Sequence, residues 1–247
     1  MGTKQSTKKG PSYAEINEKL VRKAIVDNRG ELARLDSTTA IREWFDAWVA
    51  TVDTEPQFVW KLFLRELNKG VGVNSAELWA KEQAEHRAQV AEAARVAPLL
   101  RVCTAGFVGE TPDGETVASW AICNAQADQS SRAYGEINPD KQKSYDPEDP
   151  NSADMVAAYK AVALLADAVG YLGGEAGVIR AQLVISNPNI DTDRLVSMAL
   201  KDSVSLTVEH HEEADNPAVE VCETEVGERH WKDLAPRDFV IEGEQGQ

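Results

Sequence analysis

The spacing of apolar residues changes once along this chain, near residue 98, and this change constrains the fold more than any other feature. Before it, apolar side chains recur every three or four residues, as in Ile41, Phe45, Trp48 and Val52, which is the period of an amphipathic helix. After it, the segments are shorter, and residues 116–123 alternate as in a strand. The sequence therefore predicts an α+β protein with a helical N-terminal half and a mixed α/β C-terminal half containing two antiparallel hairpins.

Four helices are expected in the first region, at residues 13–29, 39–52, 54–70 and about 75–96. The third has the clearest signals at its ends. Thr54 and Gln57 fit a capping box, Pro56 lies in the first turn where its missing N–H costs nothing, and Gly70 suits a left-handed residue at the C-terminus.

The mixed region is expected to begin with a hairpin formed by 100–108 and 116–123. Its turn is Thr111-Pro112-Asp113-Gly114, in which proline presets φ and glycine accepts a positive φ. The remaining segments are expected to be a third strand at 132–137, a loop at 138–151, a helix at 152–172, a strand or helix at 178–186, a helix at 191–201 and a second hairpin from 203–209 and 218–224.

Charge is distributed unevenly along the chain. The net charge is −15; the first 70 residues contain 12 Lys and Arg against 10 Asp and Glu, whereas residues 202–247 contain 3 against 13. This balance excludes a uniformly basic nucleic-acid binder. We divide the chain into a flexible basic arm (1–12, with Lys4, Lys8 and Lys9), a helical region (13–97), a mixed α/β region (98–241) and a polar tail (242–247).

The familiar catalytic signatures are missing from the sequence. It contains no G-x-S-x-G, no G-x-x-x-x-G-K-[ST], no H-E-x-x-H and no G-x-G-x-x-G. We therefore expect no catalytic residue and no cofactor, and the sequence favours a non-enzyme.

A metal site is not expected either. His210 and His211 are adjacent on a predicted strand, where neighbouring side chains point to opposite faces. A three-ligand site from His210, Cys222 and His230 is the alternative to a solvated, acid-rich hairpin tip, which we favour. The odd number of cysteines, with no C-x-x-C, predicts reduced thiols.

One basic feature has a defined geometry. Lys61, Arg65 and Lys69 follow one another at four-residue spacing on the third predicted helix, so they form a stripe along one face. Such a stripe suits phosphate groups or an acidic partner. The alternative is the solvated face of an amphipathic helix, whose other face carries Phe58 and Leu62.

Tryptophans are concentrated in the helical region. Trp44 and Trp48 are expected in its core, at i and i+4 of one helix. Trp60 lies off the apolar stripe of its helix and Trp79 lies on a polar helix, so these two are candidate interface aromatics.

The predicted order of helix (75–96), three strands (100–137) and helix (152–172) resembles the layout of double-stranded-RNA-binding domains. That family places lysines at the start of its last helix, where this chain has Asn151-Ser152-Ala153-Asp154. The resemblance therefore concerns topology and does not imply the phosphate-binding chemistry.

These observations favour a non-enzymatic, self-associating structural protein, such as a virion or other assembly subunit. One alternative is a nucleic-acid-associated accessory protein with an α-β-β-β-α core, which would bind through the basic stripe. A second is an enzyme without familiar motifs. We expect a homo-oligomer in the cytoplasm or a virion. We expect no membrane segment and no secretory signal, because the sequence has no apolar run of about 18 residues and a polar start.

Overall fold

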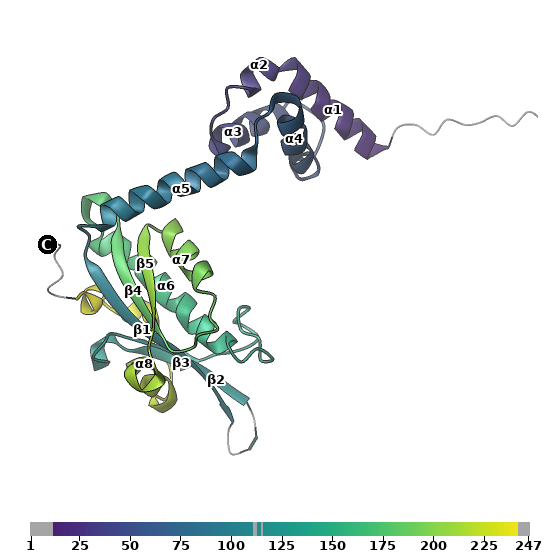
Figure 1. Ribbon diagram of the computed structural model, residues 1–247. Coiled ribbons are helices and arrows are strands. Elements are labelled where there is room, and N and C mark those ends of the chain that lie inside the picture. Colours follow the sequence, from purple (N-terminus) through teal and green to yellow (C-terminus); the bar gives the residue numbers. More distant parts are fainter. Residues whose placement is uncertain (1–11, 111–112, 115, 242–247) are drawn as a thin grey trace, which may run out of the picture. The chain divides into compact units, whose positions relative to one another are not determined.

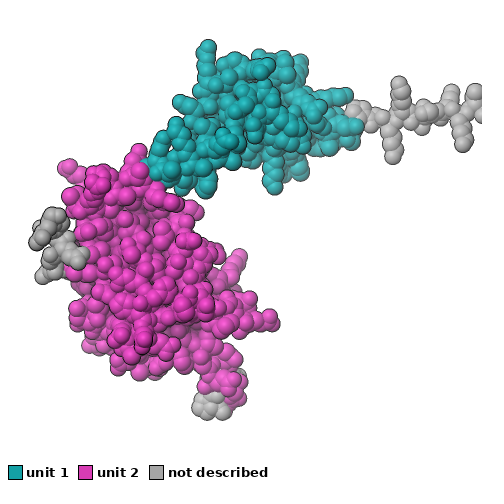
Figure 2. Space-filling model, in the orientation of Figure 1, with its two compact units in different colours: residues 1–86 teal, residues 87–247 magenta. Residues whose placement is uncertain are grey.

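The computed structural model describes residues 12–110, 113–114 and 116–241 (Figure 1). The chain divides into two compact units, residues 1–86 and 87–247 (Figure 2), and the division falls within helix α5 (Ser75–Ala94). Residues 1–11 of the predicted arm and the tail 242–247 lie outside the described residues. Ser12 is described, and it caps the first helix through a capping box with Glu15.

Unit 1 consists of helices packed around one apolar core. The helices are α1 (Tyr13–Asp27), α2 (Arg29–Leu32), α3 (Thr38–Val49), α4 (Pro56–Val71) and the first part of α5. Residues at helical spacing meet in the core, which comprises Val21, Ile25, Leu32, Ile41, Phe45, Val49, Val59, Phe63 and Leu67. The predicted helical character of this region is therefore confirmed.

An aromatic cluster lies in this core. Phe63 is fully buried, and the rings of Trp44, Phe45, Trp48 and Trp60 lie around it at centroid distances of 5.2 to 6.1 Å. Trp44 and Trp48 stack on each other at 6.2 Å, but they are half-buried and pack against the core. The expected i, i+4 contact is present, whereas full burial is not.

The predicted ends of α4 need correction. The helix begins at Pro56 with Glu55 as N-cap and no side-chain capping bond, because the Thr54 hydroxyl donates instead to Oδ1 of Asn17 at 3.2 Å. The helix also runs past Gly70 and ends at Val71, with Gly72, whose φ is +83°, as its C-cap. A Cβ at position 70 would lie 2.8 Å from Cγ2 of Ile25, so this glycine lets α1 approach α4.

Unit 2 is built on a five-stranded mixed sheet. The strands are β1 (Leu99–Glu110), β2 (Thr116–Cys123), β3 (Ala133–Glu136), β4 (Ile179–Ile185) and β5 (Val204–His210), in the order β3-β2-β1-β4-β5. The pairs β1–β2 and β2–β3 are antiparallel, and β1–β4 and β4–β5 are parallel. The first predicted hairpin and the third strand are thus confirmed.

Helices cover both faces of this sheet (Figure 1). On one face, α6 (Ser152–Leu172) and α7 (Thr192–Lys201) enclose the main core with Leu100 and Val102 of β1. On the other face, α8 (Pro217–Thr224) packs on Cys103 and Ala105 of the same strand. Short 3₁₀ turns lie at Gln129–Ser131, Gly174–Ala176, Glu213–Asp215, Trp231–Asp233 and Pro236–Phe239.

The second predicted hairpin is wrong, although the α+β class is confirmed. The predicted strand at 203–209 is present as β5 (Val204–His210), but it pairs in parallel with β4. Residues 218–224 belong to α8, because Pro217 occupies the first turn and the Asn216 side chain accepts the Ala218 N–H at 3.2 Å. Ala218, Val221 and Cys222 are buried at helical spacing.

The layout resembling a double-stranded-RNA-binding domain is present only as a segment order. β1 is the central strand and pairs with β4 as well as β2, so the three-stranded meander is part of a larger sheet. The loop 138–151 contains no helix or strand, as expected, but Tyr145 is buried in the main core and anchors it.

By length and composition, one helix in the described ranges, α6, would suffice to cross a membrane. In this fold its Val156, Ala157 and Leu165 are fully buried in the core of unit 2. A core helix of an α/β protein meets the same criteria.

Candidate interaction surfaces and ligand pocket

The predicted basic stripe lies on the surface of unit 1. Lys61, Arg65 and Lys69 are all exposed on α4. Arg65 places Nη2 3.0 Å from Oε1 of Glu66 and 3.6 Å from Oε1 of Glu18. Within the described residues, neither lysine has a carboxylate within 4 Å. The uncompensated positive charge is therefore concentrated at the two ends of the stripe.

Glu66 is the buried member of this charge network. Arg22 also contacts it, with Nε 3.2 Å from Oε2. Burial acts to raise the pKa of Glu66, but the hydrogen bonds from Arg65 and Arg22 outweigh burial and keep that pKa below its usual value. Arg65 is thus part of the internal structure of unit 1.

The two candidate interface tryptophans differ. Trp60 is half-buried, with its ring 4.7 Å from that of Phe45 and the Arg42 guanidinium 4.9 Å from its own ring centroid. Trp79 is 57% exposed on α5. Sequence reasoning missed an exposed aromatic pair, Tyr13 and Phe58, whose rings meet edge to face at 6.2 Å. Phe58 had been placed on the apolar face of its helix.

The outer edge of β5 is an unpaired strand edge. The Ser203 carbonyl accepts from Ile179 N–H, and the His211 N–H donates to the Ile185 carbonyl. Odd-numbered residues of β5 therefore face β4, and the peptide groups of Leu206, Val208 and His210 point outward. No described segment pairs with this side.

The two edges of the sheet differ in their protection. β3 has four residues, and Tyr134 exchanges backbone hydrogen bonds of 3.1 and 2.9 Å with Arg229. β5 has seven residues, with no proline and no lysine. Its one acid, Glu209, lies 3.4 Å from Nη2 of Arg101. Proteins usually protect such edges by shortness, charge, proline or cover; β5 is not short, has no proline and no paired described segment, and its single carboxylate is engaged by Arg101.

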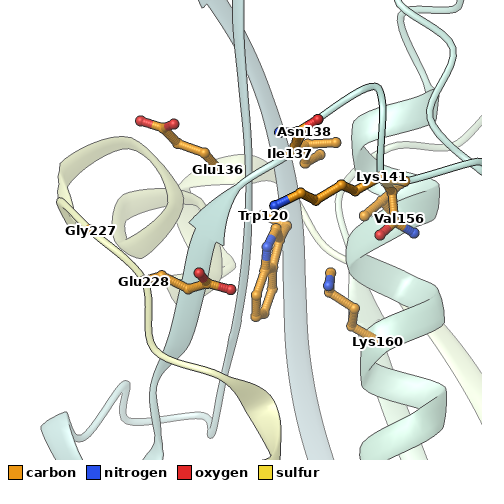
Figure 3. A pocket seen from close by; sticks show the side chains of 10 residues that line it. Trp120, Glu136, Ile137, Asn138, Lys141, Val156, Lys160, Gly227 and Glu228 are labelled. Atoms are coloured by element: carbon orange, nitrogen blue, oxygen red, sulfur yellow. The ribbon is translucent and has the colours of Figure 1, made fainter.

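A pocket of about 480 Å³ lies on the α6 side of the sheet, beside Trp120 (Figure 3). Its walls come from β2, from the segment that follows β3, from α6 and from the segment at residues 227–228. The lining residues are Trp120, Glu136, Ile137, Asn138, Lys141, Gln142, Val156, Lys160, Gly227 and Glu228. Sequence reasoning did not find this pocket, because its walls come from four separate segments.

Polar side chains gather at the carboxyl end of β4, beside the middle of β1, and ligands bind at the carboxyl ends of strands in many open α/β sheets. Asp154 accepts from Gly106 N–H at 2.7 Å and from Nδ2 of Asn187 at 2.8 Å. Asn216 donates to the Thr104 carbonyl and to Oγ of Ser186. These bonds join the middle of β1 and the end of β4 to α6 and to the start of α8, so a structural role accounts for the cluster.

The predicted histidines and cysteines are not brought together. Within the described ranges, no group of three or more His, Cys, Asp or Glu side chains has metal-binding geometry. His230 accepts the Lys232 N–H at the start of a 3₁₀ turn. His211 lies near Arg101.

The three thiols are free and buried. Cys103 and Cys123 are cross-strand neighbours in the β1–β2 pair. The hydrogen bond with Cys103, together with burial, raises the pKa of Cys123, and burial raises the pKa of Cys222 to about 11 against a hydrogen bond to Ser119.

Comparison with protein-family models, with curated proteins and with solved structures found no significant match.

Proposed function

We propose that this chain is a non-enzymatic, self-associating structural protein in which two copies pair through the outer edges of their β5 strands. The observation that carries the proposal is the open β5 edge, which lacks the usual protection against pairing. Unpaired N–H and C=O groups on a strand edge are a template for another strand. A second copy supplies an identical edge.

A two-fold antiparallel pair centred on Thr207 suits the side chains of β5. In that register Leu206 lies opposite the partner's Val208, and Glu209 lies opposite the partner's Ser205. Leu206 and Val208 pack on the border of the main core, so the pair would extend the apolar layer and keep the two Glu209 carboxylates apart. Such an interface is self-complementary and closes at two copies.

The proposal is tested at Thr207, which is exposed and would lie opposite its own copy. Thr207→Lys places two ammonium groups face to face, and Thr207→Glu does the same with carboxylates. The masses of the parent and each variant are measured by sedimentation over a range of concentrations. Val226→Lys, at a 92% exposed site away from β5, is the matched control.

We expect the parent and Val226→Lys to associate and each Thr207 variant to remain a monomer. An equimolar mixture of Thr207→Lys and Thr207→Glu should associate again, because opposite charges then meet. A parent that stays monomeric at every concentration, or a Thr207→Lys protein that associates like the parent, would refute the proposal.

A further inference from the structure

We propose that an exposed surface of unit 1, formed by Tyr13, Phe58 and Lys61, binds the acidic, proline-containing loop 146–150 of another copy of the chain. The contact is heterologous, because the two surfaces differ, whereas β5 pairing is two-fold and self-complementary. It uses no residue of β5 and therefore does not depend on the proposed pair.

An aromatic pair lies exposed on unit 1. Tyr13 is 55% exposed and Phe58 is 56% exposed, and their rings meet edge to face with 6.2 Å between the centroids. The Tyr13 hydroxyl also lies 3.4 Å from Oγ1 of Thr54, which holds the pair at the first turns of α1 and α4. Unlike the buried ring of Phe63, both rings present apolar surface to the solvent.

Lys61 places an uncompensated positive charge next to this pair. It lies three residues after Phe58 on α4, so the two side chains are neighbours on the helix surface. Both are exposed, and within the described residues no carboxylate lies within 4 Å of Lys61. Lys69, two turns further along, adds a second charge of this kind. The surface therefore suits a partner that combines apolar groups with carboxylates.

The acidic charge that this surface would attract lies in unit 2. Residues 1–86 contain 13 Lys and Arg against 13 Asp and Glu, whereas residues 87–247 contain 13 against 28. The whole net charge of −15 therefore belongs to unit 2. This charge attracts the cations on unit 1 of another copy, and it opposes a polyanion such as a nucleic-acid backbone.

The loop 146–150, which precedes α6 (Figure 1), combines the two properties that the surface requires. Its residues are Asp146, Pro147, Glu148, Asp149 and Pro150, and all five are exposed. In the part of the chain that the structure describes, none of the three carboxylates has a cation within 4 Å. The prolines supply apolar rings, which aromatic side chains bind in many peptide-recognition sites.

Hydrogen bonds hold this loop in shape before any partner binds. Oδ1 of Asp146 accepts from the Glu148 N–H at 3.0 Å, and Oδ1 of Asp149 accepts from the Asn151 N–H at 2.9 Å. The Ser152 hydroxyl donates to the Asp146 carbonyl at 2.6 Å. Because the loop is already ordered, docking costs little further conformational entropy.

The test follows the backbone amide signals of α4 in ¹⁵N NMR of the full chain. The labelled protein carries Thr207→Lys, which suppresses β5 pairing, and it is titrated with unlabelled Thr207→Lys protein. A second titrant carries Glu148→Gln and Asp149→Asn in addition. Its matched control carries Glu175→Gln and Glu213→Gln, which neutralise two exposed acids of unit 2 outside the loop.

Two further variants change the labelled protein instead. Phe58→Gln removes the exposed ring, and Lys61→Gln removes the adjacent charge. Their matched controls are Trp79→Gln, at another exposed aromatic residue, and Lys23→Gln, at an exposed lysine of α1. Retained dispersion of the amide signals shows that each variant is folded.

We expect a contact weaker than β5 pairing, which shifts the signals around Phe58 at titrant concentrations above those at which the parent pairs. The Kd should rise about threefold or more with the loop variant, with Phe58→Gln and with Lys61→Gln, and it should stay unchanged in the three matched controls. Absence of a concentration-dependent shift, or equal Kd values for the loop variant and its control, would overturn the proposal.

A single-stranded oligonucleotide represents the competing class of partner. We expect it to bind more weakly than the loop, because the charge of unit 2 repels it. If the oligonucleotide shifts the same signals with a lower Kd than the loop does, the surface is a nucleic-acid site and the proposed contact is wrong.

Discussion

The backbone N–H of Gly106 donates to Oδ1 of Asp154 over 2.7 Å, which joins β1 to the first turn of α6. A side chain at position 106 cannot be accommodated, because its Cβ would lie 2.2 Å from both the Ala153 carbonyl carbon and the Asp154 nitrogen. The central strand and the central helix of unit 2 thus meet at a backbone contact that only glycine permits.

Gly106→Ala should therefore destabilise unit 2 by about 1–3 kcal/mol or more, since backbone would have to move. Chemical denaturation followed by far-UV circular dichroism measures the loss. Gly170→Ala on α6 is the matched control, because nothing lies within 4 Å of its added Cβ and alanine favours a helix. A Gly106→Ala protein as stable as Gly170→Ala would show that the contact is looser than described.

Unit 1 should lose stability at acid pH through Glu66. The pKa of Glu66 in the folded state lies below the ordinary 4.5. The ionised carboxylate therefore contributes fully to the free energy of unfolding above pH 4.5, and this contribution is lost as the pH falls through the folded-state pKa. Thermal unfolding between pH 7 and pH 3 measures the effect. Glu66→Gln should flatten the pH dependence, whereas exposed Glu43→Gln should leave it as in the parent.

The stability of unit 1 should fall strongly when Phe63 is replaced by alanine and should change little when Trp79 is replaced. Phe63→Ala removes the buried ring that the others surround, and should cost about 3–5 kcal/mol. Trp79 is 57% exposed, so Trp79→Ala should change stability by about 0.5 kcal/mol or less. Urea unfolding monitored by tryptophan fluorescence compares the two, and similar losses would contradict the described burial.

The three thiols should resist modification until unit 2 unfolds. All are buried, and the raised pKa values of Cys123 and Cys222 keep these two thiols protonated at neutral pH. With a thiol reagent such as Ellman's reagent, we expect slow labelling of the native protein and complete labelling in denaturant. Rapid labelling of the native protein would contradict the packing between α8 and the sheet.

The ends of the basic stripe should add a weaker, salt-sensitive contact with an acidic surface between copies already held together through β5. Lys61→Glu with Lys69→Glu should weaken association and reduce its salt dependence, because such charges are screened over about 8 Å at physiological salt. Lys19→Glu with Lys23→Glu on α1 is the matched control. Changing Arg65 is a poor test, since a glutamate there would stand beside Glu66. Equal association of both double variants would argue against the stripe.

Local signals were sufficient to predict much of the fold. The turn signal in the sequence of residues 111–114, of which 111 and 112 lie outside the described residues, and the alternation in 116–123 predicted the first hairpin. The Ala-rich run after Ser152 predicted α6. The segment 218–224 was misread because Val219 and Val221 also fit strand alternation, while the helix depends on the cap at Asn216. The order of strands in the sheet decides whether β5 pairs with β4 or with a later segment, and the residues within and around a strand do not indicate its partner.

The candidate sites were harder to predict for the same reason. The stripe at Lys61, Arg65 and Lys69 follows from helical spacing, which places the three residues on one face of α4, and all three are exposed. The compensation of Arg65 by Glu18 depends on how α1 meets α4. The pocket combines Trp120, Lys160 and Glu228, residues far apart in sequence, so no single segment contains its pattern.

The backbone bridge between Tyr134 and Arg229 limits how far the sheet can grow. The bridge occupies part of the β3 edge, so among the described residues that edge is less available to a second strand than the β5 edge. If two copies pair through β5 as proposed, their two five-stranded sheets would join into one of ten strands, and the bridged β3 edges at its two ends would not favour growth into a fibre. Any particle larger than a pair must be joined through contacts other than strand pairing.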